Sequence, residues 1–109
     1  MPESTPNSRP HPRLPLGRVT ATRGAIALLQ RAGVSFVALL ARHARGDWGD
    51  IDAEDAAANE DSLLRGLRVL SAYKLQISYP DSPRTLEETI WVVTEADRSA
   101  TVFLLPEEY

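Results

Sequence analysis

Five polar residues near the ends of expected secondary-structure elements are of types that could carry out chemistry: His43, Arg45, Glu95, Arg98 and Thr101. A histidine or carboxylate can act as a general base, an arginine can hold a phosphate, and a hydroxyl can position it. Together these groups are sufficient for metal-independent RNA cleavage, in which the ribose hydroxyl is the nucleophile. These residues can form one site only if the end of the helix that contains His43 faces the hairpin around Glu95.

The same residues also have structural interpretations. His43 follows Phe36, Leu39 and Leu40 on one apolar stripe at helical spacing, which is typical of a hydrogen-bonded core histidine. Asp97 can cap a tight turn, and Arg98 can pair with a neighbouring carboxylate.

A second set of side chains could contact a partner: Arg42, Arg45, Asp47, Trp48, Asp50, Asn59, Tyr73 and Asp97. Charge is distributed unevenly around them although the net charge is only -3. From residue 18 to 45 every charged residue is an arginine, whereas from 47 to 61 every charged residue is an acid. If the fold separates these segments, the surface is bipolar.

The sequence predicts no metal or cofactor. It has no P-loop, no GxGxxG, no HExxH and no nucleophile elbow. The spacing of Asp47, Asp50 and Asp52 differs from that of a calcium-binding loop. We therefore expect neither a nucleotide site nor a zinc site.

Three helices are expected first along the chain. Thr22 is a candidate N-cap for a helix that ends at Gly33, and Ser35 can cap a second helix that contains His43. Two glycines around Trp48 indicate a tight loop, after which Asp52 can cap a third helix. Asn59 falls on the inner face of this helix and should need a buried partner.

From residue 69 the pattern changes to the two-residue period of a strand, and two more strands follow at about 90–93 and 101–105. Their short connections predict a three-stranded antiparallel meander, with a possible fourth edge strand at 16–20. We expect an α+β fold with the helices on one face of the sheet.

Composition places this fold in one domain. A chain of 109 residues with 43% hydrophobic residues can form a single core, which we assign to residues 16–109. Residues 1–15 hold five prolines and predict a disordered tail. The absence of cysteine, of a signal peptide and of a long apolar stretch favours a cytoplasmic protein that does not contact a membrane.

Two motifs carry a resemblance to a known family: RHARGDWG at 42–49, running on to Asn59, and WVVTEADRS at 91–99, running on to the terminal PEEY. Across about residues 16–109 the chain resembles small uncharacterised proteins carried on bacterial plasmids and integrated elements. The resemblance implies a protein from a mobile element and carries no activity with it. The chain departs from the family pattern in a longer connection at 77–88.

Three functions remain open at this stage. The first is a protein-binding module that docks on a host or element-encoded protein, because no catalytic signature is present. The second is a metal-independent ribonuclease-like toxin, since the order of helices and sheet resembles that of small bacterial toxin ribonucleases. The third is a nucleic-acid-binding accessory that uses the arginines of residues 18–45. A homodimer could form through an uncovered sheet face or edge strand.

Overall fold

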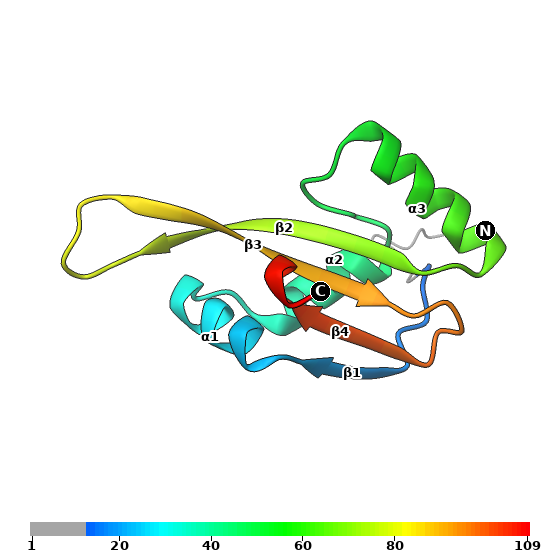
Figure 1. Cartoon of the computed structure of the whole chain (residues 1–109), viewed down its shortest axis with the longest axis horizontal. Helices are drawn as coiled ribbons and strands as arrows, with labels where there is room; N and C mark the ends of the chain where they lie inside the picture. Colours follow the sequence, from blue (N-terminus) through cyan, green and yellow to red (C-terminus); the bar gives the residue numbers. More distant parts are fainter. Residues whose placement is uncertain (1–12) are drawn as a thin grey trace, which may run out of the picture.

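The computed structural model describes residues 13–109 and shows three helices, a four-stranded sheet and a short terminal 3-10 helix (Figure 1). In chain order the elements are β1 (Arg18–Ala21), α1 (Arg23–Ala32), α2 (Phe36–Ala44), α3 (Ala53–Arg65), β2 (Val69–Ser78), β3 (Thr85–Thr94), β4 (Ala100–Leu104) and η1 (Pro106–Glu108). The α+β class and the antiparallel order β2, β3, β4 are confirmed. The fourth strand also exists, and it lies parallel to β4 at the edge of the sheet.

The helices begin and end where their capping residues predict. Thr22 accepts a hydrogen bond from the Ala25 amide, and Asp52 accepts one from the Asp55 amide, so each satisfies a free N–H of a first turn. Gly33 ends α1 with a φ of 68°, a left-handed conformation that glycine adopts without steric cost.

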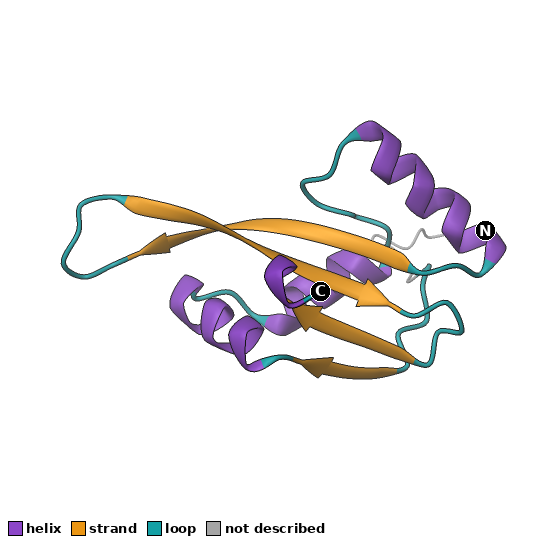
Figure 2. Cartoon of the chain, in the orientation of Figure 1, coloured by secondary structure: helices purple, strands orange, loops and turns teal. Residues whose placement is uncertain are grey.

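Helices α1 and α2 pack on one face of the sheet and form the main core with it (Figure 2). The core uses alternate residues of β2, and Tyr73, Leu75 and Ile77 all lie in it. Phe36 of α2 meets Phe103 of β4 edge to face, with ring centroids 5.0 Å apart. This packing buries the inward side of α2, on which His43 lies.

Helix α3 occupies a different place from the expected one. It runs along the outer edge of β2, where the Asn59 side chain donates to the Leu70 carbonyl and accepts from the Leu70 amide at 2.7 and 3.1 Å. The side chain thus replaces a neighbouring strand at this position, because an edge strand otherwise leaves these backbone groups unpaired. Asn59 therefore has the buried partner that the sequence predicts.

The domain begins earlier than the predicted boundary at residue 16. The amides of Arg13 and Leu14 both donate to the Ala44 carbonyl, and Leu14 is only 2% exposed. Leu14 packs with Trp48 and Val69 in a second, smaller core. Residues 13–15 therefore belong to the domain, and the remainder of the predicted tail lies outside the described residues.

Strands β2 and β3 extend beyond the rest of the sheet as a long hairpin, seen at the left of Figure 1. Strand β3 begins at Thr85, five residues before the predicted start, because half of the long 77–88 connection is strand. Strand β4 pairs only with residues 91–94 of β3. We call residues 75–78 of β2 together with 85–89 of β3 the arm.

No single helix in residues 13–109 is both long and apolar enough to cross a membrane. Helices α1 and α2 together have a suitable length and composition, but they meet at a bend of 107°.

Candidate functional site

His43 lies at the centre of a buried chain of polar side chains. Its ring is 0% exposed. Nδ1 lies 2.6 Å from the Ser71 hydroxyl and Nε2 lies 2.8 Å from the Thr94 hydroxyl. Thr94 in turn lies 2.7 Å from Thr101, whose hydroxyl donates to the Leu16 carbonyl at 2.8 Å. The chain thus joins α2 to β2, β3, β4 and the segment before β1.

The direction of each hydrogen bond in this polar chain follows from the last side chain in it, Thr101. Since Thr101 uses its only proton on the Leu16 carbonyl, the bond between the two threonines must be donated by Thr94. The Thr94 hydroxyl has no second proton, so it can only accept a hydrogen bond from His43. Nε2 therefore carries the ring proton, and Nδ1 accepts a hydrogen bond from Ser71. This arrangement uses both nitrogens of the neutral ring.

Burial lowers the pKa of His43 from 6.5 to about 4, because the charged ring would lose its hydration. A general base needs a ring nitrogen within reach of its substrate. Within the described part of the chain, His43 presents neither nitrogen to the surface, and its contacts are those of a structural core histidine.

A second polar cluster holds the loop around Trp48. Arg42 contacts both carboxylate oxygens of Asp47, at 2.7 and 3.2 Å, and its guanidinium carbon lies 4.6 Å from the centre of the Tyr73 ring. Arg42 holds the pKa of Asp47 below its ordinary value. The Tyr73 hydroxyl donates to the Asp47 carbonyl at 2.7 Å, and burial raises the pKa of this hydroxyl to about 12. Arg45 approaches the same carboxylate at 3.9 Å.

Other predicted binding residues in this region also have structural contacts. The Trp48 indole donates to Glu60 at 3.0 Å, so the loop is fastened to α3. Asp50 accepts from the Lys74 amide at 2.8 Å, which continues the closure of the β2 edge that Asn59 begins. These contacts fix the loop to the sheet.

The hairpin between β3 and β4 faces the end of α3. Arg98 donates to the carbonyls of Leu67 and Ser62 at 2.7 and 3.1 Å and so caps the last turn of that helix. Glu95 pairs with Arg68 at 3.1 Å. Asp97 accepts from the Ser99 amide at 3.0 Å, as expected for a residue that caps a turn.

The five candidate catalytic residues therefore do not form one site among the described contacts. His43 and Thr101 are joined through Thr94 in the core. Glu95 and Arg98 instead contact Arg68 and the end of α3, and Arg45 lies beside Asp47. Within residues 13–109, no three histidine, aspartate or glutamate side chains are grouped so that they could hold a metal ion.

The fold separates the two charged segments only in part, because Arg42 and Arg45 lie beside Asp47. Arg18, Arg23 and Arg31 are exposed on β1 and α1, and none of them forms an ion pair with another described residue. The acidic start of α3 lies beyond the opposite edge of the sheet (Figure 1). The charge is therefore divided across the sheet for these three arginines and the start of α3, and not for the whole of the two segments.

Two features were missed by sequence reasoning. One is the unpaired edge of β3 in the arm. The other is a cleft between α3 and Trp91. The β-branched residues Thr85, Thr89 and Ile90 could have indicated a longer strand. The cleft depends on the placement of α3 and has no local signal.

Comparison of the chain with protein-family models, with curated proteins and with solved structures finds no match.

Proposed function

We propose that this chain is a protein-binding module that takes up an extended segment of a partner protein as an added strand along the free edge of β3. The observation that carries the proposal is the run of backbone groups at Thr85, Glu87 and Thr89, which face away from β2 beyond the end of β4. Strand addition of this kind uses main-chain hydrogen bonds for affinity and alternate side chains for specificity.

The hydrogen bonds of the sheet fix which residues face outward. On β2, Leu70, Ala72 and Lys74 use their amides for bonds outside the sheet. Because the pattern alternates in an antiparallel ladder, the odd-numbered residues of β2 bond to the even-numbered residues of β3. The odd-numbered residues of β3 then face the other way. Trp91 and Val93 meet β4 there, whereas Thr85, Glu87 and Thr89 have no strand beside them in the described structure.

The two edges of the hairpin differ in how far they are closed. Side-chain and loop contacts close the β2 edge at Leu70, Ala72 and Lys74. No comparable contact from the described residues closes β3 at 85–89. The open stretch of β3 is also longer than that of β2, where among the outward-facing residues only Gln76 and Ser78 lack such a contact from the described residues.

Side chains beside the β3 edge indicate what the added segment should contain. Leu86 is 49% exposed on the face that continues the core, and Glu87 points to the opposite face. A partner segment should therefore place an apolar side chain beside Leu86 and a basic one beside Glu87, at neighbouring positions that point to opposite faces. The family resemblance would make the partner a host protein or one encoded by the same mobile element.

The two alternative functions gain less support. The ribonuclease hypothesis needs an accessible His43, and the buried hydrogen-bond chain uses both of its ring nitrogens. The nucleic-acid hypothesis counted Arg42 and Arg45, which both lie beside Asp47.

A proline substitution tests the proposal. Random heptapeptides are displayed and selected against the full chain, and the tightest is titrated by fluorescence anisotropy against Glu87→Pro and Gln76→Pro. Both variants remove the Gln76–Glu87 side-chain bond and one outward amide, but from opposite edges of the same hairpin.

We expect Glu87→Pro to weaken the peptide about tenfold, the effect of roughly one lost hydrogen bond, and Gln76→Pro to bind like the native chain. Circular dichroism confirms that both variants fold. Equal affinities for all three proteins would refute strand addition at β3.

A further inference from the structure

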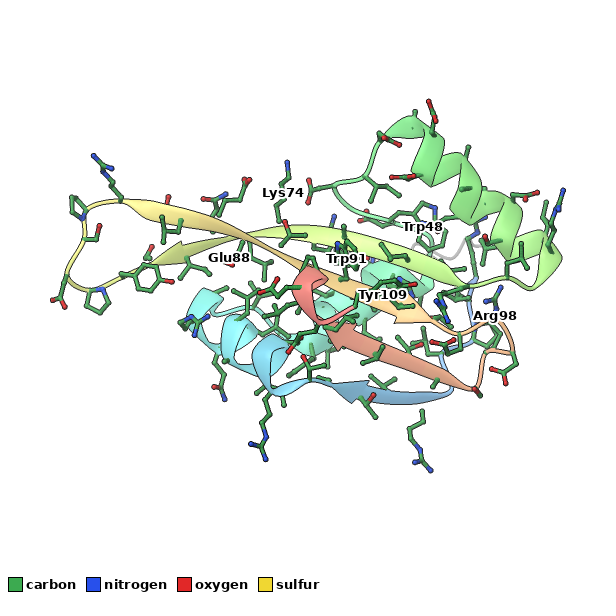
Figure 3. All side chains as sticks on the ribbon, viewed as in Figure 1. Trp48, Lys74, Glu88, Trp91, Arg98 and Tyr109 are labelled. Atoms are coloured by element: carbon green, nitrogen blue, oxygen red, sulfur yellow. The ribbon has the colours of Figure 1, made fainter. Side chains whose placement is uncertain are left out.

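A cleft of about 270 Å³ lies between α3 and the sheet face opposite to α1 and α2. It is lined by Ile51, Asp55, Ala58, Asn59, Leu70 and Trp91. Figure 3 shows Trp91 on the face that also holds Tyr109 and Lys74. The volume is slightly below the ~300 Å³ at which pockets for small molecules begin, and it suits a single side chain.

The cleft results from the way α3 meets the sheet. Asn59 holds the helix to the edge of β2, so the helix lies beside the sheet face without covering it. The neighbouring α3 residue that lines the cleft is Ala58, whose side chain is only a methyl group, and Trp91 lines the cleft from the sheet. One side of the indole therefore borders open space.

The polar and aromatic lining favours a cation. Asp55 lines the cleft, Glu54 stands with it in the first turn of α3, and Asp52 caps that turn. Trp91 is held edge to face by Tyr109, with ring centroids 5.4 Å apart. A tryptophan face is the best aromatic partner for a cation, and a nearby carboxylate supplies the counter-charge.

The basic residue nearest to this aromatic pair is already engaged. Arg68 donates to the Tyr109 hydroxyl at 2.7 Å and pairs with Glu95, so it does not neutralise Asp55. Lys74 lies two residues along β2 from Ala72, the residue that pairs with Trp91, and is exposed on the same face. One lysine does not offset the acidic start of α3.

We propose that the cleft binds an arginine side chain of a protein partner, with the planar guanidinium stacked on Trp91 and paired with Asp55. Arginine suits the site better than lysine, because its flat guanidinium can lie on the indole and donate in its own plane to the carboxylate. The site is separate from the β3 edge, so either proposal can fail without the other.

The test uses the ¹⁵N-labelled full chain and two probes of the same shape. N-acetyl-arginine methylamide carries the charge, and N-acetyl-citrulline methylamide is its neutral counterpart. NMR follows the indole N–H signals of both tryptophans. Trp48 serves as an internal control, because its indole donates to Glu60 and does not line the cleft.

We expect the arginine probe to shift the Trp91 signal with a Kd on the order of 1 mM, as for one side chain alone, and to leave Trp48 unchanged. Asp55→Asn should weaken binding about threefold to fivefold, the effect of one partly exposed charge pair, whereas Glu54→Gln should change it little. An equal response to the citrulline probe, or equal affinity in the Asp55 and Glu54 variants, would overturn the proposal.

Discussion

His43 should make the stability of this protein depend on pH in a range where few other groups titrate. The folded chain keeps the ring neutral down to about pH 4, whereas the unfolded chain takes up a proton near pH 6.5. The unfolded state therefore binds more protons between these values, and the free energy of unfolding falls as the pH is lowered. The contribution of the neutral His43 ring to the free energy of unfolding is complete above about pH 6.5 and is lost as the pH falls to about 4.

The size of the effect follows from the two pKa values. Their difference of about 2.5 pH units corresponds to about 3 kcal/mol in total. Lowering the pH from about 7.5 to about 5 should remove about 2 kcal/mol of it. The measurement stops at about pH 5 because the carboxylates of Asp47 and Glu60, whose pKa values the neighbouring arginines lower, add their own losses at lower pH.

Urea denaturation at both pH values provides the assay. The chain has one other histidine, His11, so His11→Gln is used as the common background. On that background the His43→Gln variant should be less stable by about 1–3 kcal/mol at about pH 7.5, since it leaves part of the polar chain unpaired. Its stability should change little between the two pH values.

Equal losses with and without His43 would refute the reasoning. They would mean that the ring takes up a proton as readily in the folded protein as in the unfolded chain. An NMR titration of the His43 ring protons checks the same point, and a midpoint near pH 6.5 would contradict the buried hydrogen-bond chain.

Two further substitutions test the closed edge and the loop of the Trp48 region by urea denaturation. Asn59→Leu should cost about 2 kcal/mol, because the Leu70 amide and carbonyl lose their partner, and a cost under about 0.5 kcal/mol would show that water replaces the side chain. Gly49→Ala should cost at least about 3 kcal/mol, since a Cβ there collides with the Ala72 carbonyl at a φ of 80°. Gly33→Ala, at a φ of 68° with open space around it, should cost only about 1 kcal/mol, and similar costs at the two glycines would contradict this difference.

Local features of the fold were predictable because they depend on residues close together in the chain. Thr22, Ser35 and Asp52 cap the helices as their side chains allow. The helical spacing placed His43 on the buried face, and the two-residue period located β2.

The remaining features depend on long-range contacts, and no local pattern specifies them. The position of α3 along the sheet edge rests on contacts such as the pairing of Asn59 with Leu70 and of Glu60 with Trp48, which join separate elements. Arg98 caps the end of α3 from a backbone φ of 63°, which an arginine rarely adopts. Leu14 followed a proline-rich segment and still became part of the core.

The backbone groups of β3 give the most direct test of the binding proposal. Amide hydrogen exchange, followed by NMR, should show alternation along the arm in the free protein, with fast exchange at Thr85, Glu87 and Thr89 and slower exchange at Leu86 and Glu88. Addition of the selected peptide should slow the three fast amides and leave Gln76 and Ser78 unchanged. Protection at Gln76 and Ser78 instead, or no protection at the three β3 amides, would contradict strand addition at this edge.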